Sequence, residues 1–187
     1  MGPHQFRRLV HISAPLFCVY YILPEELFPG IGRDQGVIFI MLLALGFEAL
    51  RLIFLIKVPG MRPYEFERPS AAAWTAVGMT FALLLFPVEL TLPVMMGMGW
   101  VDPIIGEMRK RKSDLYPSFP VIIYAALMVV GLGYFYGLTP MVLVASALVA
   151  PLAVFVESLR VRYIDDDIML IVVPLLFLAL VFGQLPL

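Results

Sequence analysis

The sequence predicts an all-α, polytopic integral membrane helix bundle with about seven transmembrane helices. Hydrophobic residues make up 61% of the 187-residue chain and charged residues only 14%. Mean hydropathy is +0.95, whereas a soluble domain carries about 25% charged residues. These three observations exclude an ordinary soluble domain.

Seven apolar stretches are the candidate membrane-spanning helices. A transmembrane helix needs about 20 mainly apolar residues, and the stretches lie near residues 9–24, 36–57, 70–87, 89–106, 118–136, 139–157 and 168–186. The first stretch follows two arginines, as the apolar part of a signal peptide does. However, His11 and Pro15 interrupt it and no small-residue cleavage site follows, so we expect it to be retained as the first helix.

Basic residues predict the orientation, because lysine and arginine are retained on the cytoplasmic side of a membrane. Eleven of the 13 lie before span one or between spans two and three, four and five, and six and seven. The opposite connections, PEELFPGIGRDQ, the tight turn at Pro87 and GLTP, hold only Arg33. We therefore expect a cytoplasmic amino terminus, a carboxyl terminus on the other side, and chemistry at the cytoplasmic face.

Composition narrows the possible ligands. The net charge is −1, so no global basic field attracts nucleic acid. Cys18 is the only cysteine, and His4 and His11 are the only histidines, which leaves little for a transition-metal centre. Binding of a hard cation by carboxylates remains open.

Glu48 and Arg51 are costly charges inside span two. A charged side chain at membrane depth costs about 2.5 to 3.5 kcal/mol on insertion scales, so such a residue has a partner or a function. The two are three residues apart in GFEALRL, which places them on one face of a helix. They form either a self-neutralising ion pair or a bundle-facing pair, in which Arg51 binds a phosphate or Glu48 assists a proton transfer.

Asp102 is a further intramembrane carboxylate, in GMGWVDPIIGEMRKRK at the end of span four. Helical spacing aligns it with Gly99, Gly106 and Arg109 along one stripe. The glycines either allow close helix packing or let a ligand or metal approach the backbone. The basic run at residues 109–112 is either a topological anchor or a phosphate-binding segment. Packing does not require a carboxylate, so we expect a functional role for Asp102.

Three successive aspartates, Asp165, Asp166 and Asp167, begin the last span in ESLRVRYIDDDIML. One aspartate suffices to cap a helix and to complement its positive end. Three of them beside Arg160 and Arg162 favour a site for Mg²⁺, which prefers carboxylates together with substrate phosphate oxygens.

These clusters combine carboxylates for a hard metal with arginines for phosphates. This is the equipment for phosphoryl or nucleotidyl transfer, where catalysis depends on positioning and electrostatic stabilisation. The absence of a GxxxxGK[ST] segment excludes a P-loop. The charged segment MRPYEFERPSAAAWT is interpreted as a solvated loop. Because almost the whole chain is expected in the bilayer, the expected acceptor is a lipid.

Five short motifs follow one another along the chain: RRLVH at residues 7–11, EALR at 48–51, E-x-x-R-x-S-A at 65–71, D-x-x-x-G at 102–106 and ESLRVRYIDDD at 157–167. This order resembles the polyprenol kinase family, which includes dolichol kinase and phytol kinase, and the resemblance covers essentially the whole chain. It implies CTP-dependent phosphorylation of a long-chain isoprenoid alcohol, such as dolichol or another polyprenol, geranylgeraniol or phytol, with Mg²⁺.

The resemblance also implies roles for single residues. Asp102 and Gly106 match the family's nucleotide and metal segment, and Arg8 and His11 match its amino-terminal motif. The terminal acidic segment is matched by Asp165 and Asp166, with Glu157 ahead of them. The family's Lys-Ser-x-x-Gly-like segment is replaced here by RKRKSDLYPSFP, in which Lys112 with Ser113 or Ser118 is an imperfect match to the Lys-Ser pair. In addition, Asp167 stands where the family has Asn, and Val101 stands where it has Gly. These departures concern the donor, CTP or ATP, more than the reaction class.

The expected mechanism is direct in-line transfer of the γ-phosphate, with a carboxylate or His11 accepting the alcohol proton. The candidate residues form three sets. The catalytic set is Asp102, His11, Glu48 and Asp166; the nucleotide- and phosphate-binding set is Arg8, Arg51, Gly106, Arg109, Lys110, Lys112 and Arg160; and the Mg²⁺ set is Asp102, Asp165, Asp166 and Asp167.

Two alternatives remain open. A CTP-dependent cytidylyltransferase acting on a lipid phosphate needs the same metal and cytidine apparatus, but its usual carboxyl-terminal Lys-Arg-x-x-Lys-Asp-like segment is missing. A non-catalytic polyprenyl-lipid transporter would be favoured by inverted repeats, and no convincing repeat is found. We expect residues 1–187 to form one transmembrane catalytic domain in a prokaryotic cell membrane, or in the endoplasmic reticulum of a eukaryote. Membrane lipid is an expected partner, nucleic acid is not, and homo-oligomer formation is possible.

Overall fold

The computed structural model describes residues 11–58, 61, 63–159, 161 and 164–185. Helices dominate this part of the chain, and two very short strands form a hairpin. The elements in chain order are η1 (Ala14–Ile22), β1 (Glu26–Phe28), β2 (Ile31–Gly32), α2 (Arg33–Ile53), η2 (Pro63–Phe66), α3 (Ala71–Leu85), α4 (Val88–Lys110), α5 (Ser118–Tyr136), α6 (Pro140–Ser158) and α7 (Asp166–Phe182).

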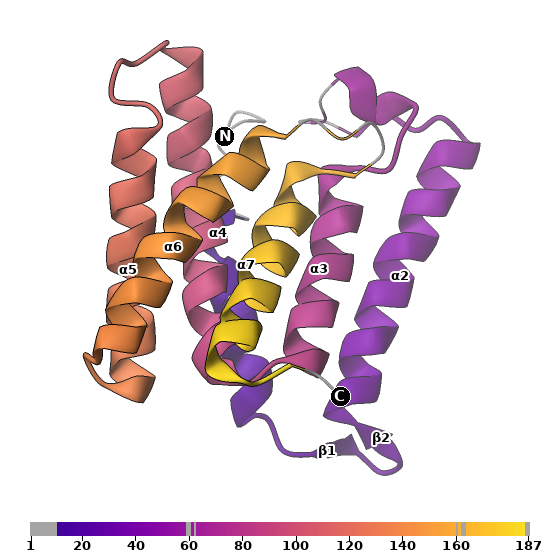
Figure 1. Cartoon of the computed structure of the whole chain (residues 1–187). Coiled ribbons are helices and arrows are strands. Elements are labelled where there is room, and N and C mark those ends of the chain that lie inside the picture. The colour runs from indigo at the N-terminus through magenta and orange to yellow at the C-terminus, as the bar shows by residue number, and fades with distance from the viewer. Residues whose placement is uncertain (1–10, 59–60, 62, 160, 162–163, 186–187) are drawn as a thin grey trace.

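The α-helices alternate in direction, so that their ends gather at two levels (Figure 1). Helices α2, α4 and α6 end at the level where α3, α5 and α7 begin, and the β1–β2 hairpin lies at the opposite level. We call the first level the charged end, because Arg51, Arg109 and Glu157 lie in the last turns of their helices there and Asp165 directly precedes α7. The acidic and basic motifs of the sequence are thereby collected on one side of the bundle.

Helix α4 is the packing centre of the bundle. It contacts α5, α7 and η1, while α6 joins α5 to α7, and α3 joins α7 to α2. Two glycines allow the close approach of α4 and α5: a Cβ on Gly97 would lie 2.5 Å from the Tyr124 ring, and one on Gly131 would lie 2.7 Å from Pro93. These contacts are helix packing through small residues.

The described residues contain four helices that are long and apolar enough to cross a membrane, namely α2, α4, α5 and α6. Helices α3 and α7 occupy the third and seventh expected stretches with 15 and 17 residues. The mainly helical bundle is confirmed, and its apolar helices are consistent with a membrane protein. Large apolar side chains are exposed on the outward faces of α2, α5 and α6, which suits contact with lipid.

The first apolar stretch differs from the α-helix expected at residues 9–24. Its described part forms the nine-residue 3₁₀-helix η1, which at about 2 Å per residue is about 18 Å long, against a hydrocarbon core of about 30 Å. Pro15 has no N–H to donate to the His11 carbonyl four residues earlier. That carbonyl instead lies against α4, where a Cβ on Gly99 would be only 2.4 Å from it.

Candidate functional site

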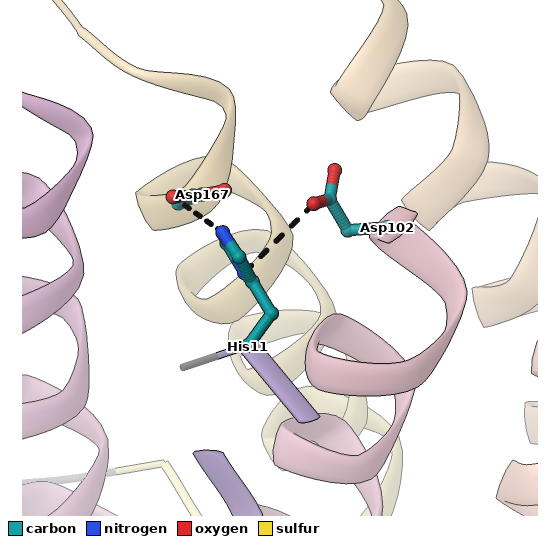
Figure 2. A group of neighbouring side chains, drawn as sticks. All are labelled: His11, Asp102 and Asp167. Carbon is teal, nitrogen blue, oxygen red and sulfur yellow. Dashed lines mark ion pairs between the residues drawn. The ribbon is translucent and has the colours of Figure 1, made fainter. Parts of the chain in front are cut away.

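His11, Asp102 and Asp167 meet at the charged end, although they come from three separate segments: the residues before η1, helix α4 and helix α7 (Figure 2). The Nδ1 atom of His11 lies 3.8 Å from Oδ2 of Asp102, and its Nε2 atom lies 3.8 Å from Oδ2 of Asp167. The side chains are nearly buried, with exposed fractions of 7%, 12% and 1% for His11, Asp102 and Asp167. Figure 2 shows the imidazole standing between the two carboxylates.

Local contacts explain how these three residues come together. The missing side chain of Gly99 lets the His11 backbone rest on α4, and Trp100 Nε1 donates a 3.2 Å hydrogen bond to the Ile12 carbonyl. On the other side, Thr75 Oγ1 of α3 donates to Asp167 Oδ2 at 3.1 Å. The His11 segment is therefore fastened to α4, and Asp167 of α7 is fastened to α3.

The acidic residues form a connected set around Asp102. Ligand atoms lie within 4.8 Å of one another in three groups: His11, Asp102 and Asp167; Asp102, Glu157 and Asp166; and Asp165, Asp166 and Asp167. The second and third groups offer only carboxylate oxygens, which are the ligands that Mg²⁺ prefers. The donor set of the described residues thus fits a divalent hard cation.

Asp165 begins α7 as its N-cap, where its Oδ1 accepts a 3.3 Å hydrogen bond from the Asp167 backbone N–H. Burial, a hydrogen bond with Asp166 and the negative charges of Asp167 and Asp166 raise the pKa of the Asp165 carboxyl to about 8. A cation at this place would favour the ionised form, because a metal competes with the proton for the carboxylate.

Arg109 extends the acidic set toward α6. Its Nη1 donates to Glu157 Oε1 at 3.0 Å, its Nη2 pairs with Glu157 Oε2, and its Nε and Nη2 reach the Tyr116 hydroxyl at 3.2 and 2.9 Å. Glu157 is 4% exposed, whereas the Arg109 side chain is 35% exposed. Arg109 therefore partly neutralises the acidic set and still reaches its open edge.

Glu48 and Arg51 form the ion pair that their spacing predicts. Arg51 donates from Nε and Nη2 to Glu48 at 2.9 and 2.7 Å, and Nη2 also donates to the Arg68 carbonyl at 2.7 Å. Ser70 donates its backbone N–H and its hydroxyl to Glu48 at 2.6 and 3.0 Å. Both carboxylate oxygens are thus engaged, which favours the interpretation of a self-neutralising pair over that of a proton acceptor.

A cavity of about 550 Å³ lies between η1, α2 and α3. Along α3 its lining extends from Ser70 to Leu83, or about 20 Å at 1.5 Å per residue. Most of the lining is apolar, and the charged residues in it are His11, Glu48, Arg51, Glu65 and Asp167. Its volume falls within the 300 to 1,000 Å³ that is usual for ligand sites.

The structure brings some of the predicted site residues together and separates others. One group converges around Glu157 and consists of His11, Asp102, Asp165, Asp166, Asp167 and Arg109. A second group lines the cavity and consists of Glu48 and Arg51 together with His11 and Asp167. Lys110 and Lys112 are exposed, and a Cβ on Gly106 would meet nothing within 4 Å of the described atoms. Arg8 and Arg160 lie outside the described residues.

The predicted solvated loop is the main correction. Glu65 is 3% exposed, Ser70 is 8% exposed, and both line the cavity; Glu65 also accepts from the Ala71 backbone N–H at 3.2 Å. Thr75 and Tyr116 are likewise site residues that the sequence analysis missed. Ser70 carried a usable signal, because a serine before AAAW is a typical N-cap, and its Oγ accepts from the Ala73 N–H at 3.3 Å.

Comparisons with known proteins add no further assignment. No family model matches the chain, no curated protein matches it, and no solved structure matches it.

Proposed function

We propose that the protein is a Mg²⁺-dependent lipid kinase that transfers the γ-phosphate of CTP to the hydroxyl of a long-chain isoprenoid alcohol at the cytoplasmic face of a membrane. One observation carries the proposal: the acidic set around Asp102 lies at the polar end of an apolar, lipid-sized cavity, and His11 and Asp167 belong to both. A phosphate donor and a lipid acceptor would meet at such a place.

The carboxylates of the acidic set would hold the cation. A bound Mg²⁺ supplies charge neutralisation for the triphosphate. Asp166 belongs to both oxygen-only groups, so it would hold the cation together with Asp102 and Glu157 of one group or with Asp165 and Asp167 of the other. Arg109 and the exposed Lys110 and Lys112 would bind donor phosphates from the open edge of the site. This assignment uses the oxygen-only groups, which match the preference of Mg²⁺ better than the group that contains His11.

The transfer step is an in-line displacement. The alcohol oxygen forms a bond to the γ-phosphorus as the bond between this phosphorus and the β,γ-bridging oxygen breaks, and CDP leaves. The alcohol proton passes to His11 or to Asp167, the two cavity-lining groups that also belong to the acidic set. Glu48, whose oxygens are already hydrogen-bonded, acts as a positioning residue for Arg51.

The test is transfer of γ-labelled phosphate from CTP to geranylgeraniol and to dolichol by the purified protein with Mg²⁺. We expect label in the organic phase with the native sequence and with Asp114→Asn, which changes an exposed aspartate in the loop after α4. Label should fall more than about 100-fold with Asp102→Asn, since even partners of metal ligands contribute about 10- to 100-fold.

The outcomes separate the alternatives. Absence of γ-label, with cytidine label entering a lipid phosphate from α-labelled CTP, would replace the kinase with a cytidylyltransferase. Absence of both products, with movement of a polyprenyl lipid across vesicles, would replace it with a transporter. ATP run in parallel with CTP decides the donor.

A further inference from the structure

The cavity between η1, α2 and α3 has one polar end and an apolar length, which is the shape of a single-chain amphiphile. Helix α2 contributes Val37, Met41 and Ala44 to its wall before Glu48 and Arg51 at the charged end. From Val37 to Arg51, which is 14 positions further along the chain, the helix rises about 21 Å. The polarity of the wall therefore gives a bound lipid one direction, with its headgroup at Arg51.

Arg51 lines this cavity, and one of its side-chain donors is unused. The side chain is 1% exposed, its Nε and Nη2 are engaged, and Nη1 is buried without a hydrogen-bond partner among the described residues. An unpaired buried donor costs about 1 to 3 kcal/mol, so such groups in native proteins have a partner or a function. An oxygen atom of a cavity ligand would supply that partner.

The charges that line the cavity favour a neutral ligand oxygen over an anionic one. Among the described residues that line it, Arg51 and His11 face three carboxylates, those of Glu48, Glu65 and Asp167. Glu48 already neutralises Arg51, and Glu65 acts on the same guanidinium electrostatically. An anionic headgroup would meet this excess of carboxylates, whereas a neutral hydroxyl oxygen can accept from Nη1 without repulsion.

We propose that this cavity binds one isoprenoid alcohol, with its hydroxyl oxygen on Arg51 Nη1 and its chain along α2 and α3 past Ala44. The inference deepens the proposed function by assigning its acceptor site, but it concerns binding alone and needs neither nucleotide nor metal. Ala44 lies two helical turns from Arg51, about 10 Å along the helix. The size of the side chain at this position therefore determines which lengths of isoprenoid chain fit the cavity.

The test measures binding of tritiated geranylgeraniol to the full chain in detergent, without CTP or Mg²⁺, and its displacement by unlabelled lipids. Ala44→Phe fills the cavity beside the chain, and Ala49→Phe makes the same change on the exposed face of α2, outside the cavity lining. We expect Ala44→Phe to weaken geranylgeraniol about tenfold, the equivalent of losing burial of about two methylene groups. Geraniol, with half the chain, should be weakened less, and Ala49→Phe should match the native protein.

Arg51→Lys tests the polar end. Lysine keeps a charge for Glu48 but loses the planar fork of donors. The native protein should bind phytol more tightly than the corresponding hydrocarbon, and this preference should shrink about tenfold in the variant, as a lost charge-assisted hydrogen bond implies. Equal preference in both proteins would overturn the assignment of Arg51.

Four further results decide the inference. Equal affinities of Ala44→Phe and Ala49→Phe for geranylgeraniol would contradict the cavity, as would displacement by a two-chain phospholipid at the same concentration as by geranylgeraniol. Specific binding of the alcohol without any phosphate transfer would contradict the proposed function and leave the acceptor site standing. Phosphate transfer with no effect of Ala44→Phe on binding would contradict the acceptor site and leave the proposed function standing.

Discussion

The two charged clusters of this protein use the same residue types in different ways. The cluster on α2 and α3 is closed, because Glu48, Arg51 and Ser70 are joined by hydrogen bonds of 2.6 to 3.0 Å. In the cluster around His11, the imidazole nitrogens lie 3.8 Å from the facing oxygens of Asp102 and Asp167, beyond hydrogen-bond length. The first arrangement fastens two helices, and the second leaves carboxylate oxygens spaced for a cation.

The difference follows from how each cluster is assembled. Glu48 and Arg51 share one helical face, so their pairing forms with α2 itself. His11 lies just before η1, Asp102 lies in α4 and Asp167 lies in α7, so the three meet only when the whole bundle has packed. A short-range pair can therefore be optimised for stability, whereas the long-range group depends on the rest of the fold.

The largest expected effect is on the closed cluster. Arg51→Met leaves the Glu48 carboxylate buried without its counterion, and removing one partner of a buried pair costs about 3 to 5 kcal/mol. The double variant Glu48→Gln/Arg51→Met should lose clearly less, because no uncompensated charge remains. Chemical unfolding in detergent measures both, and equal losses in the single and double variants would show that the pair is not the stabilising element.

Metal binding tests the open cluster. We expect Mn²⁺, used as a paramagnetic substitute for Mg²⁺, to bind the native protein and Asp114→Asn alike, and Asp102→Asn more than about 100-fold more weakly. Asp102 belongs to two of the three ligand groups, so its loss damages both. Electron paramagnetic resonance counts the free ion. Unchanged binding in Asp102→Asn would remove the distinction drawn between the clusters.

A pair of glycine variants tests how α4 holds the backbone of His11 in place. A Cβ on Gly99 would lie 2.4 Å from the His11 carbonyl oxygen, whereas one on Gly106 would meet nothing within 4 Å. Gly99→Ala should therefore cost about 1 to 3 kcal/mol, as overpacking does. Gly106→Ala should be neutral or stabilise by up to about 1 kcal/mol, because alanine favours helix. Thermal unfolding of the two variants compares them, and the reverse order would contradict the packing of η1 on α4.

The smallest effect concerns pH. The pKa of Asp165 is raised from 3.8 to about 8 in the folded protein, so the folded state keeps a proton that the unfolded state releases. Stability should therefore fall as pH rises from about 4 to 8, and Asp165→Asn should flatten this slope. Unfolding of the metal-free protein across this range checks the sign. A stability that rises with pH in the native protein, and not in the variant, would contradict it.

Much of the fold could be predicted from sequence, since α4, α5 and α6 begin and end within a few residues of the expected stretches. The exception is η1, where proline removed a backbone donor and the α-helical period was lost. The β1–β2 hairpin was also missed, because its strands have three and two residues, too few for any alternation of side chains to show.

The candidate site was predictable where its residues are contiguous or carry an unusual charge. The aspartates before α7 and the lone carboxylate Asp102 were found in this way. The pairing of Arg109 with Glu157, 48 residues apart, and the burial of Glu65 were not, because both depend on which helices become neighbours. Local spacing carries no information about that choice.

Helix α2 gives the fold an unusual dependence on its surroundings. Only 11% of its most apolar stretch is buried inside the structure, and within the helical bundle it packs mainly on α3. The remaining apolar face must be covered by acyl chains in a membrane protein. The surrounding bilayer then acts as a structural component. A change in bilayer thickness, or replacement of the bilayer by detergent, would alter the position of α2 before it disturbed the packing of α4 to α7.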